Sequence, residues 1–165
     1  MDIEAIRTRR LSLLPLAVEH ADEMAEVLGD PALHAFIGGV PLTREELRAR
    51  YARLVAGSPD PFVVWGNWVV RLDEERCLTG TVQATITGDG AEIAWVVGTP
   101  WQGRGIATEA ARGLVDWLRS RGVGQVYAHV HPGHAASAAV AGAVGLVRTD
   151  RMQDGEERWE ASFGA

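Results

Sequence analysis

The chain of 165 residues has a single cysteine, no lysine and no apolar run long enough to cross a membrane. Because Cys77 is alone, an intramolecular disulfide is excluded, which fits the reducing environment of the cytoplasm. The first residues carry acids and no apolar stretch, so we expect neither a signal peptide nor a membrane partner. These absences favour a cytoplasmic protein.

Positive charge is also scarce. The chain has 16 basic residues, all arginine, against 22 acidic ones, and its formal net charge is −6. Sequence-independent nucleic-acid binding depends on basic side chains that neutralise phosphates, so we expect no nucleic-acid partner. An acidic surface instead favours cationic partners, including protonated amines.

Neither an internal repeat nor a low-complexity linker divides the sequence. A length of 165 residues is typical of one domain that can bury a sizeable core. We therefore expect residues 1–165 to form a single domain.

Helical periodicity appears in four places. Apolar residues recur at helical spacing from Ala21 to Leu28, and a Thr43–Glu46 capping box opens a second helix that ends by Gly57. Helical spacing returns from Ile106 to Leu118, and a short helix is expected over residues 137–144.

Strand signals occupy the middle and the end of the chain. The β-rich runs at 68–72, 78–87 and 91–97 are joined by short turns, which predicts an antiparallel meander. Another strand is expected over 126–131, and two more flank the Asp154-Gly155 turn, with Trp159, Ala161 and Phe163 on one face. This order predicts an α/β (α+β) fold with a mixed, mostly antiparallel central sheet flanked by helices.

The most informative segment joins the strand at 91–97 to the helix that begins at Ile106. Its sequence is Gln102-Gly103-Arg104-Gly105-Ile106-Ala107. The first N–H groups of a helix lack intrahelical partners and lie at the positive end of the helix dipole, and glycines let a ligand approach them. The junction therefore predicts a pyrophosphate cradle.

Two common phosphate loops do not fit this segment. A P-loop would need a Gly-Lys-Ser/Thr triplet, which the chain does not contain. The dinucleotide fingerprint would need a third glycine where Thr108 stands, and an acidic residue about 20 positions later, where the chain reads Gly122-Val123-Gly124-Gln125.

The spacing of Gln102, Gly105 and Ala107 resembles the acetyl-coenzyme-A loop of GNAT-type acetyltransferases, in particular the branch that includes the ribosomal-protein alanine N-acetyltransferases. The resemblance extends to the Trp-Val-Val-Gly-Thr-Pro-Trp segment before the loop, and to segments near both ends of the chain: Thr8–Leu16, His20–Pro31, His134–Ser137 and Val144–Val147. Two positions depart from the branch. His134 stands where asparagine is usual, and Ala141 stands where many relatives carry a tyrosine acid.

The resemblance implies an acyltransferase that uses acetyl-CoA and no metal. Backbone N–H groups should become free for the thioester where the strand with Trp95–Val97 splays from its neighbour at a bulge-like disruption. The residues that this resemblance assigns to CoA binding are Trp95, Val96, Val97, Gln102, Gly103, Arg104, Gly105, Ile106, Ala107, Thr108, His134 and Ser137.

Transfer of an acyl group to an amine needs a proton acceptor and a proton donor. Strand alternation places Glu92 on the same side as Ala94 and Val96, so Glu92 is the candidate general base, acting directly or through water. An exposed carboxylate or an arginine partner is the alternative. Ser137 is the candidate to face the departing sulfur, although the same serine could cap the helix that follows.

Three histidines, His129, His131 and His134, form an H-x-H-x-x-H pattern that raises the question of a metal site. No cysteine or acid lies nearby to complete a ligand set, so we expect no metal. Instead, we expect His134 to hydrogen-bond the pantetheine or the backbone, and His131 is an alternative base.

We expect the acceptor to be a primary amine of a small molecule or a peptide N-terminus, bound between Phe36–Leu54 and the Asp150–Glu157 turn. Acids in this turn would attract a protonated amine, unless they form only a solvated hairpin. Two alternatives remain: a longer acyl-CoA donor such as succinyl-CoA, and a catalytically inactive CoA-binding module. The oligomeric state is expected to be a monomer or a homodimer.

Overall fold

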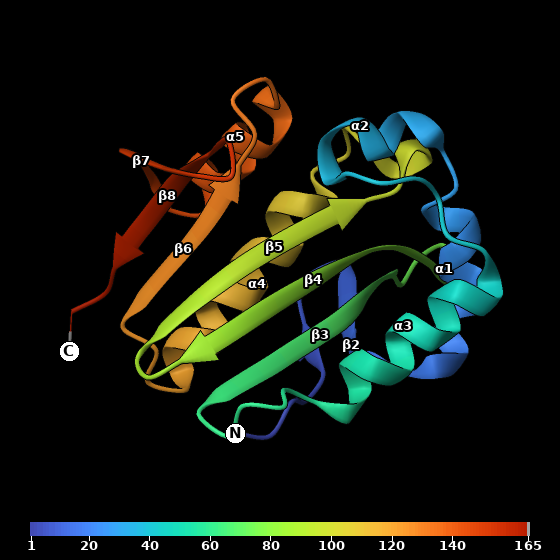
Figure 1. The fold of residues 1–165 in the computed structure, drawn as a ribbon, viewed down its shortest axis with the longest axis horizontal. Helices are drawn as coiled ribbons and strands as arrows, with labels where there is room; N and C mark the ends of the chain where they lie inside the picture. Colours follow the sequence, from blue (N-terminus) through green and yellow to red (C-terminus); the bar gives the residue numbers. More distant parts are fainter. Residues whose placement is uncertain (165) are drawn as a thin grey trace.

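Eight strands form one sheet in the order β1-β2-β3-β4-β5-β6-β8-β7. The computed structural model describes residues 1–164. Neighbouring strands are antiparallel except for β5 and β6, which run parallel. The predicted mixed, mostly antiparallel sheet is confirmed (Figure 1). Its strands are β1 (Ile6–Arg7), β2 (Leu11–Pro15), β3 (Val63–Leu72), β4 (Cys77–Thr87), β5 (Gly90–Val97), β6 (Gln125–Val130), β7 (Val147–Gln153) and β8 (Glu156–Ser162).

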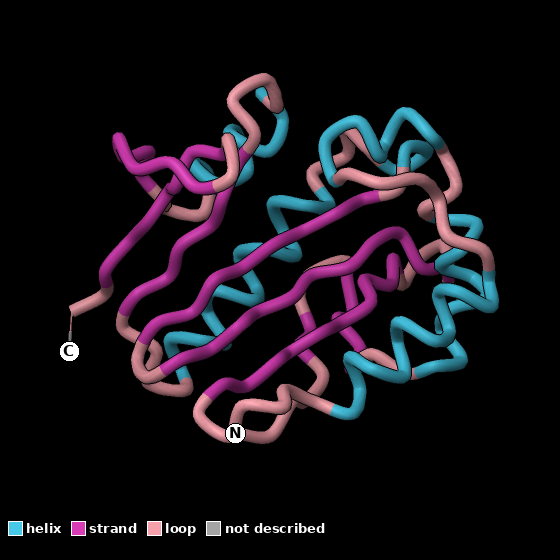
Figure 2. Tube along the Cα trace, viewed as in Figure 1, coloured by secondary structure: helices cyan, strands magenta, loops and turns pink. Residues whose placement is uncertain are grey.

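Helices cover both faces of this sheet, as Figure 2 shows. In residues 1–164, no helix is long and apolar enough to cross a membrane. The α-helices are α1 (Ala21–Val27), α2 (His34–Ile37), α3 (Arg44–Ala56), α4 (Ile106–Ser120) and α5 (Ala135–Ala143), and the 3-10 turns are η1 (Val18–His20), η2 (Pro31–Leu33) and η3 (Thr99–Trp101).

The two faces are buried to different extents. Under α4 and α5 lies the larger core, which contains Trp68, Ile93 and Leu114. On the other face, α1 and α3 pack Met24 and Tyr51 against one end of the sheet only. The remainder of that face is open and forms the floor of a cleft.

Local signals determine where the helices begin. The capping box of α3 is formed: Thr43 Oγ1 accepts from Glu46 N at 3.1 Å, and Glu46 Oε1 accepts from Thr43 N at 3.0 Å. The helix α4 begins at Ile106, as predicted. The helix α5 begins two residues earlier than predicted, with His134 as its N-cap, so the alternative role of Ser137 as an N-cap is wrong.

Several predicted strand boundaries also change. β3 begins at Val63 rather than at Trp68, and β6 ends at Val130, which leaves His131 outside the strand. The hairpin around Asp154-Gly155 is confirmed. Trp159, Ala161 and Phe163 pack toward the main core, as their alternation predicts.

The parallel pair β5 and β6 separates soon after it begins. Its ladder contains only the pairs Gly90↔Gln125, Ala91↔Val126 and Glu92↔Tyr127. Beyond Glu92 the two strands diverge, as Figure 1 shows. The expected splay is therefore present.

The cause of the splay differs from the expectation. The register between β4 and β5 is continuous from Thr87↔Gly90 to Gly80↔Val97, so the predicted bulge in β5 is wrong. β5 stays on β4, and β6 turns away instead.

The close approach of β4 to β5 gives a stability prediction. A Cβ at Gly80 would lie 2.1 Å from the Val96 carbonyl oxygen, so Gly80→Ala must push the two strands apart. We expect it to lower the free energy of unfolding by about 1–3 kcal/mol or more. A matched Gly142→Ala substitution in α5 meets only Trp159, at 4.0 Å, and should stabilise by about 0.5–1 kcal/mol through helix propensity. Urea unfolding of both variants tests this, and equal effects would contradict it.

Candidate active site

A cleft of about 860 Å³ lies on the open face of the sheet. Its floor includes Thr81 and Gln83 from β4 and Glu92, Ala94 and Val96 from β5. This arrangement confirms that Glu92, Ala94 and Val96 share one face. The walls come from α2, the α2–α3 connection and α3 on one side, and from the end of β6, His134, Ser137 and the β7–β8 turn on the other.

At the end of β5, the glycine loop leads into α4. Gly103 and Gly105 have φ values of 76° and 79°, a left-handed conformation that favours glycine. The first backbone hydrogen bond at the start of α4 runs from Glu109 N to Gly105 O, at 3.1 Å. Within residues 1–164, the N–H groups of Gly103 to Thr108 have no hydrogen-bond partner. These free donors at a helix N-terminus fit a pyrophosphate.

The side chains around this loop fix its position and add positive charge. Gln102 Nε2 donates to Val97 O at 3.0 Å, which ties the loop to the end of β5. Arg10 Nε donates to Glu109 Oε1 at 2.7 Å. The Arg10 guanidinium also lies beside the loop, because a Cβ added at Gly105 would lie 3.4 Å from Arg10 Nη2. Arg104 forms an ion pair with Glu75. Two guanidinium groups therefore adjoin the phosphate cradle.

Glu109 connects the start of the chain to the first turn of α4. Its carboxylate accepts hydrogen bonds from the Thr8 hydroxyl and from Arg10. Burial raises the pKa of this carboxyl group, but the hydrogen bonds from Thr8 and Arg10 outweigh it and hold the pKa below its usual range. Glu109 therefore stays ionised and anchors the loop.

The edge of β5 that faces the splay presents free backbone groups. Gly98 N donates to Thr79 O of the β4 side at 2.8 Å. Because N–H directions alternate along an antiparallel ladder, Val96 also points its N–H toward β4, whereas Trp95 and Val97 point theirs toward the splay. The ladder to β6 has already ended at Glu92, so these donors remain available.

Glu92 is not an isolated carboxylate. Its Oε2 lies 2.6 Å from His129 Nδ1, near the row where β5 and β6 still pair. The Glu92 side chain is 40% exposed toward the cleft, but that of His129 is only 9% exposed. The alternative of an arginine partner for Glu92 is therefore wrong, since its partner is a histidine.

The proton on His129 follows from its surroundings. A carboxylate can only accept, so Nδ1 carries the hydrogen of this bond. His129 Nε2 is buried and has no partner within residues 1–164. The pair therefore consists of a carboxylate that is partly exposed to the cleft and a buried imidazole that donates to it through Nδ1.

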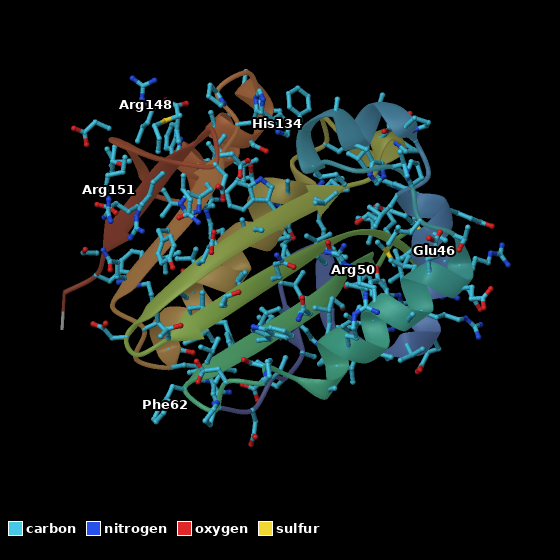
Figure 3. All side chains as sticks on the ribbon, viewed as in Figure 1. Glu46, Arg50, Phe62, His134, Arg148 and Arg151 are labelled. Carbon is cyan, nitrogen blue, oxygen red and sulfur yellow. The ribbon has the colours of Figure 1, made fainter. Side chains whose placement is uncertain are left out.

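The other two histidines lie where β6 leads into α5. His131 Nδ1 accepts from Gly133 N at 3.0 Å. The His134 ring stacks on Phe36 of α2, with centroids 4.1 Å apart. Burial, and to a lesser extent the nearby His131, lower the pKa of His134, so it is mainly neutral near neutral pH. Figure 3 shows His134 close to α2, and the residue lines the cleft.

Ser137 lies in the first turn of α5 and lines the cleft. Its hydroxyl has no hydrogen-bond partner in the described part of the chain. It is therefore free to donate to a ligand. Ala141, which stands where many relatives carry a tyrosine acid, does not line the cleft and is fully buried in the main core.

In residues 1–164, no group of three or more histidine, cysteine or acidic side chains is arranged to hold a metal ion. His129 bonds to Glu92 and His131 to the Gly133 backbone, so the H-x-H-x-x-H pattern does not converge.

Sequence reasoning missed several residues of this site. Arg50 and Tyr51 of α3 line the cleft and lie in the Phe36–Leu54 segment expected on the acceptor side, but neither had an individual role, and His129 was considered only as a metal ligand. The only signal that could have identified His129 was strand alternation, which places it on the same face as Glu92 once the parallel register is known.

Comparison with known proteins shows the family and the fold. The family model of the acetyltransferase (GNAT) domain matches residues 10–147. No curated protein sequence matches the chain. Solved structures do match over nearly the whole chain.

A GNAT-family acetyltransferase from Bacillus anthracis has a TM-score of 0.80 at 20% identity and covers 96% of this chain and 98% of its own. RimL, a ribosomal alpha-N-protein acetyltransferase in complex with CoA, has a TM-score of 0.81 at 16% identity, covering 97% and 98%. The microcin C7 self-immunity acetyltransferase MccE, in complex with acetyl-CoA and AMP, has a TM-score of 0.77 at 15% identity, covering 94% of each chain. The family match and the shared fold together show that this chain belongs to the GNAT acetyltransferase family.

Proposed function

We propose that the protein transfers the acetyl group of acetyl-CoA directly to a primary amine of a small molecule or a peptide N-terminus. The observation that carries the proposal is the alignment of three features along one path. The free amides of Gly103–Thr108 lead to the splay edge of β5, and that edge leads to Glu92 in the cleft.

Each part of the path has a binding role. The amides of the loop hold the pyrophosphate of CoA, and Arg10 and Arg104 add positive charge beside it. The Trp95 and Val97 N–H groups face the splay, where they donate to the pantetheine arm and to the thioester carbonyl. Such donors stabilise the negative charge that develops on the carbonyl oxygen.

The cleft supplies the proton acceptor. The acceptor amine must lose a proton before it can attack the thioester carbon. Glu92 takes this proton because its carboxylate is exposed to the cleft. The Nδ1–H of His129 fixes the orientation of that carboxylate, so His129 is a positioning residue.

Ser137 supplies a hydroxyl donor for the departing thiolate. We expect Ser137→Ala to lower kcat by only about 2- to 10-fold, because a thiolate is a good leaving group and needs little acid help. The free energy of unfolding should change little, since the hydroxyl has no partner in the described chain. Steady-state kinetics measure this, and a loss above about 100-fold would make Ser137 an essential acid instead.

One experiment separates this proposal from its alternatives: a matrix of acyl-CoA donors against amines and N-terminal peptides, followed by release of the free thiol. Acetyl-CoA should give the fastest turnover. Faster turnover with succinyl-CoA would change the donor, because the loop binds only the pyrophosphate that all acyl-CoAs share. Tight CoA binding without turnover of any amine would indicate an inactive CoA-binding module.

A further inference from the structure

The cleft has one positively charged wall, on α3. This helix carries four arginines, of which Arg44 and Arg48 form ion pairs with Glu26 and Asp22 of α1. Arg50 instead lines the cleft, and within residues 1–164 it has no ion-pair or hydrogen-bond partner. Figure 3 shows Arg50 between α3 and the strands.

Tyr51, next to Arg50 on α3, also lines the cleft. Its side chain is only 4% exposed, and its hydroxyl is buried without a partner in the described chain. Burial raises the pKa of Tyr51 to about 12, so the hydroxyl remains a donor at neutral pH. A buried hydroxyl without a partner is unfavourable unless a ligand accepts from it.

Arg50 and Tyr51 thus both offer hydrogen-bond donors to the same wall. A guanidinium group and a phenol hydroxyl together match an oxyanion, since arginine forms paired hydrogen bonds to carboxylates and phosphates.

The opposite wall of the cleft is acidic. It includes Asp154 and Glu156 of the β7–β8 turn, and Glu92 lies on the floor of the cleft. Neither Asp154 nor Glu156 forms an ion pair in the described chain, whereas Glu157 beside them pairs with Arg148. This wall attracts an ammonium group and delivers it to Glu92.

The distance between the two walls limits the acceptor. The helix α3 packs against β3, and Glu92 lies two strands away on β5. At a strand spacing of about 4.8 Å, the backbones of β3 and β5 lie on the order of 10 Å apart. An acceptor that extends from Glu92 toward α3 must therefore carry its anion at a distance from its amine.

We propose that the acceptor is a primary amine that also carries a carboxylate or phosphate on the order of 10 Å away, and that Arg50 and Tyr51 bind this anion. This inference rests on the proposed acetyl transfer and narrows its acceptor. A short peptide with a free carboxylate and an aminoalkyl phosphate share this chemistry.

The test compares matched acceptors with acetyl-CoA. Trialanine, which spans about 10 Å when extended, is compared with its C-terminal amide, and aminohexyl phosphate with aminohexanol. We expect wild-type kcat/KM to favour at least one anionic member by about 10- to 100-fold, mainly through KM. The acceptor pair in which the anionic member is preferred identifies the bound anion as a carboxylate or a phosphate. Equal rates within both pairs would overturn the proposal.

Variants assign the preference to the site. Arg50→Gln should abolish the preference by lowering kcat/KM of the anionic acceptor to the level of the neutral one, and Tyr51→Phe should weaken it. The matched control is Arg53→Gln, which removes the same charge from α3 at a position outside the cleft and should keep the preference. A preference that survives Arg50→Gln would place the anion elsewhere.

Failure of acetyl transfer itself would give a different result. If wild-type protein binds CoA but acetylates no amine, the proposed function fails, and the anion site is measured without turnover. Aminohexyl phosphate is then titrated while the arginine side-chain N–H and tyrosine ring resonances are followed by NMR. Saturable shifts that vanish in Arg50→Gln support the site, and their absence in wild-type protein rejects it.

Discussion

Glu92→Gln is expected to lower kcat by about 100- to 10,000-fold, because it removes the only carboxylate that lines the cleft from β5. The loss should be largest at low pH, where the acceptor amine is protonated, and should shrink as the amine loses its proton in solution. CoA affinity should barely change, since Glu92 lies away from the glycine loop. Steady-state kinetics across pH and calorimetric CoA titration measure the two effects.

A pair of His129 variants tests its role beside Glu92. His129→Leu fills a similar volume but cannot donate to Glu92, so kcat should fall by about 10-fold or more while KM is retained. His129→Asn restores an N–H donor and should recover most of the rate. If kcat of His129→Asn is as low as that of His129→Leu, the imidazole itself is needed as a base. Tyr127→Phe, on the same face of β6, is the control and should keep its activity.

Gly105→Val is expected to abolish CoA binding, with a loss of at least about 100-fold in affinity. The substitution puts a branched side chain where φ is 79° and the backbone must approach a pyrophosphate. It also brings a Cβ to 3.4 Å from Arg10 Nη2. Isothermal titration with CoA is the direct measurement.

The control must carry the same backbone strain away from the loop. Gly122 follows the other end of α4 and has a φ of 86°, and a Cβ at this position would meet no other atom within 4 Å. Gly122→Val should therefore lower the melting temperature to a similar extent and leave CoA affinity intact. If a folded Gly105→Val protein bound CoA as tightly as the wild type, the loop would not be the pyrophosphate site.

Much of the fold could be predicted because its signals are local. The capping box of Thr43 and Glu46, the β7–β8 turn at Asp154-Gly155 and the strand-to-helix loop are each specified by a few consecutive residues. The start of β3 was missed because Gly66 and Asn67 resemble strand breakers. In the structure Gly66 is required for packing, since a Cβ there would lie 2.7 Å from the Trp68 ring.

The contacts that complete the cleft could not be predicted in this way. The bond between Glu92 and His129 depends on the parallel register of β5 and β6, two strands that are connected through α4. The stack of Phe36 on His134 joins segments about 100 positions apart. Neither residue pair is marked by spacing, so the sequence could nominate Glu92 but not the histidine that holds it.

The short ladder between β5 and β6 leaves few backbone hydrogen bonds between these two strands. Only three residue pairs join the strands there, so β6, β7 and β8 are joined to the rest of the molecule mainly through the core that they share with α4 and α5. A ligand that fills the gap replaces the missing backbone partners of β5, as an added strand would. A ligand bound in the gap would thus act as a structural splint that joins β5 to β6 beyond Glu92.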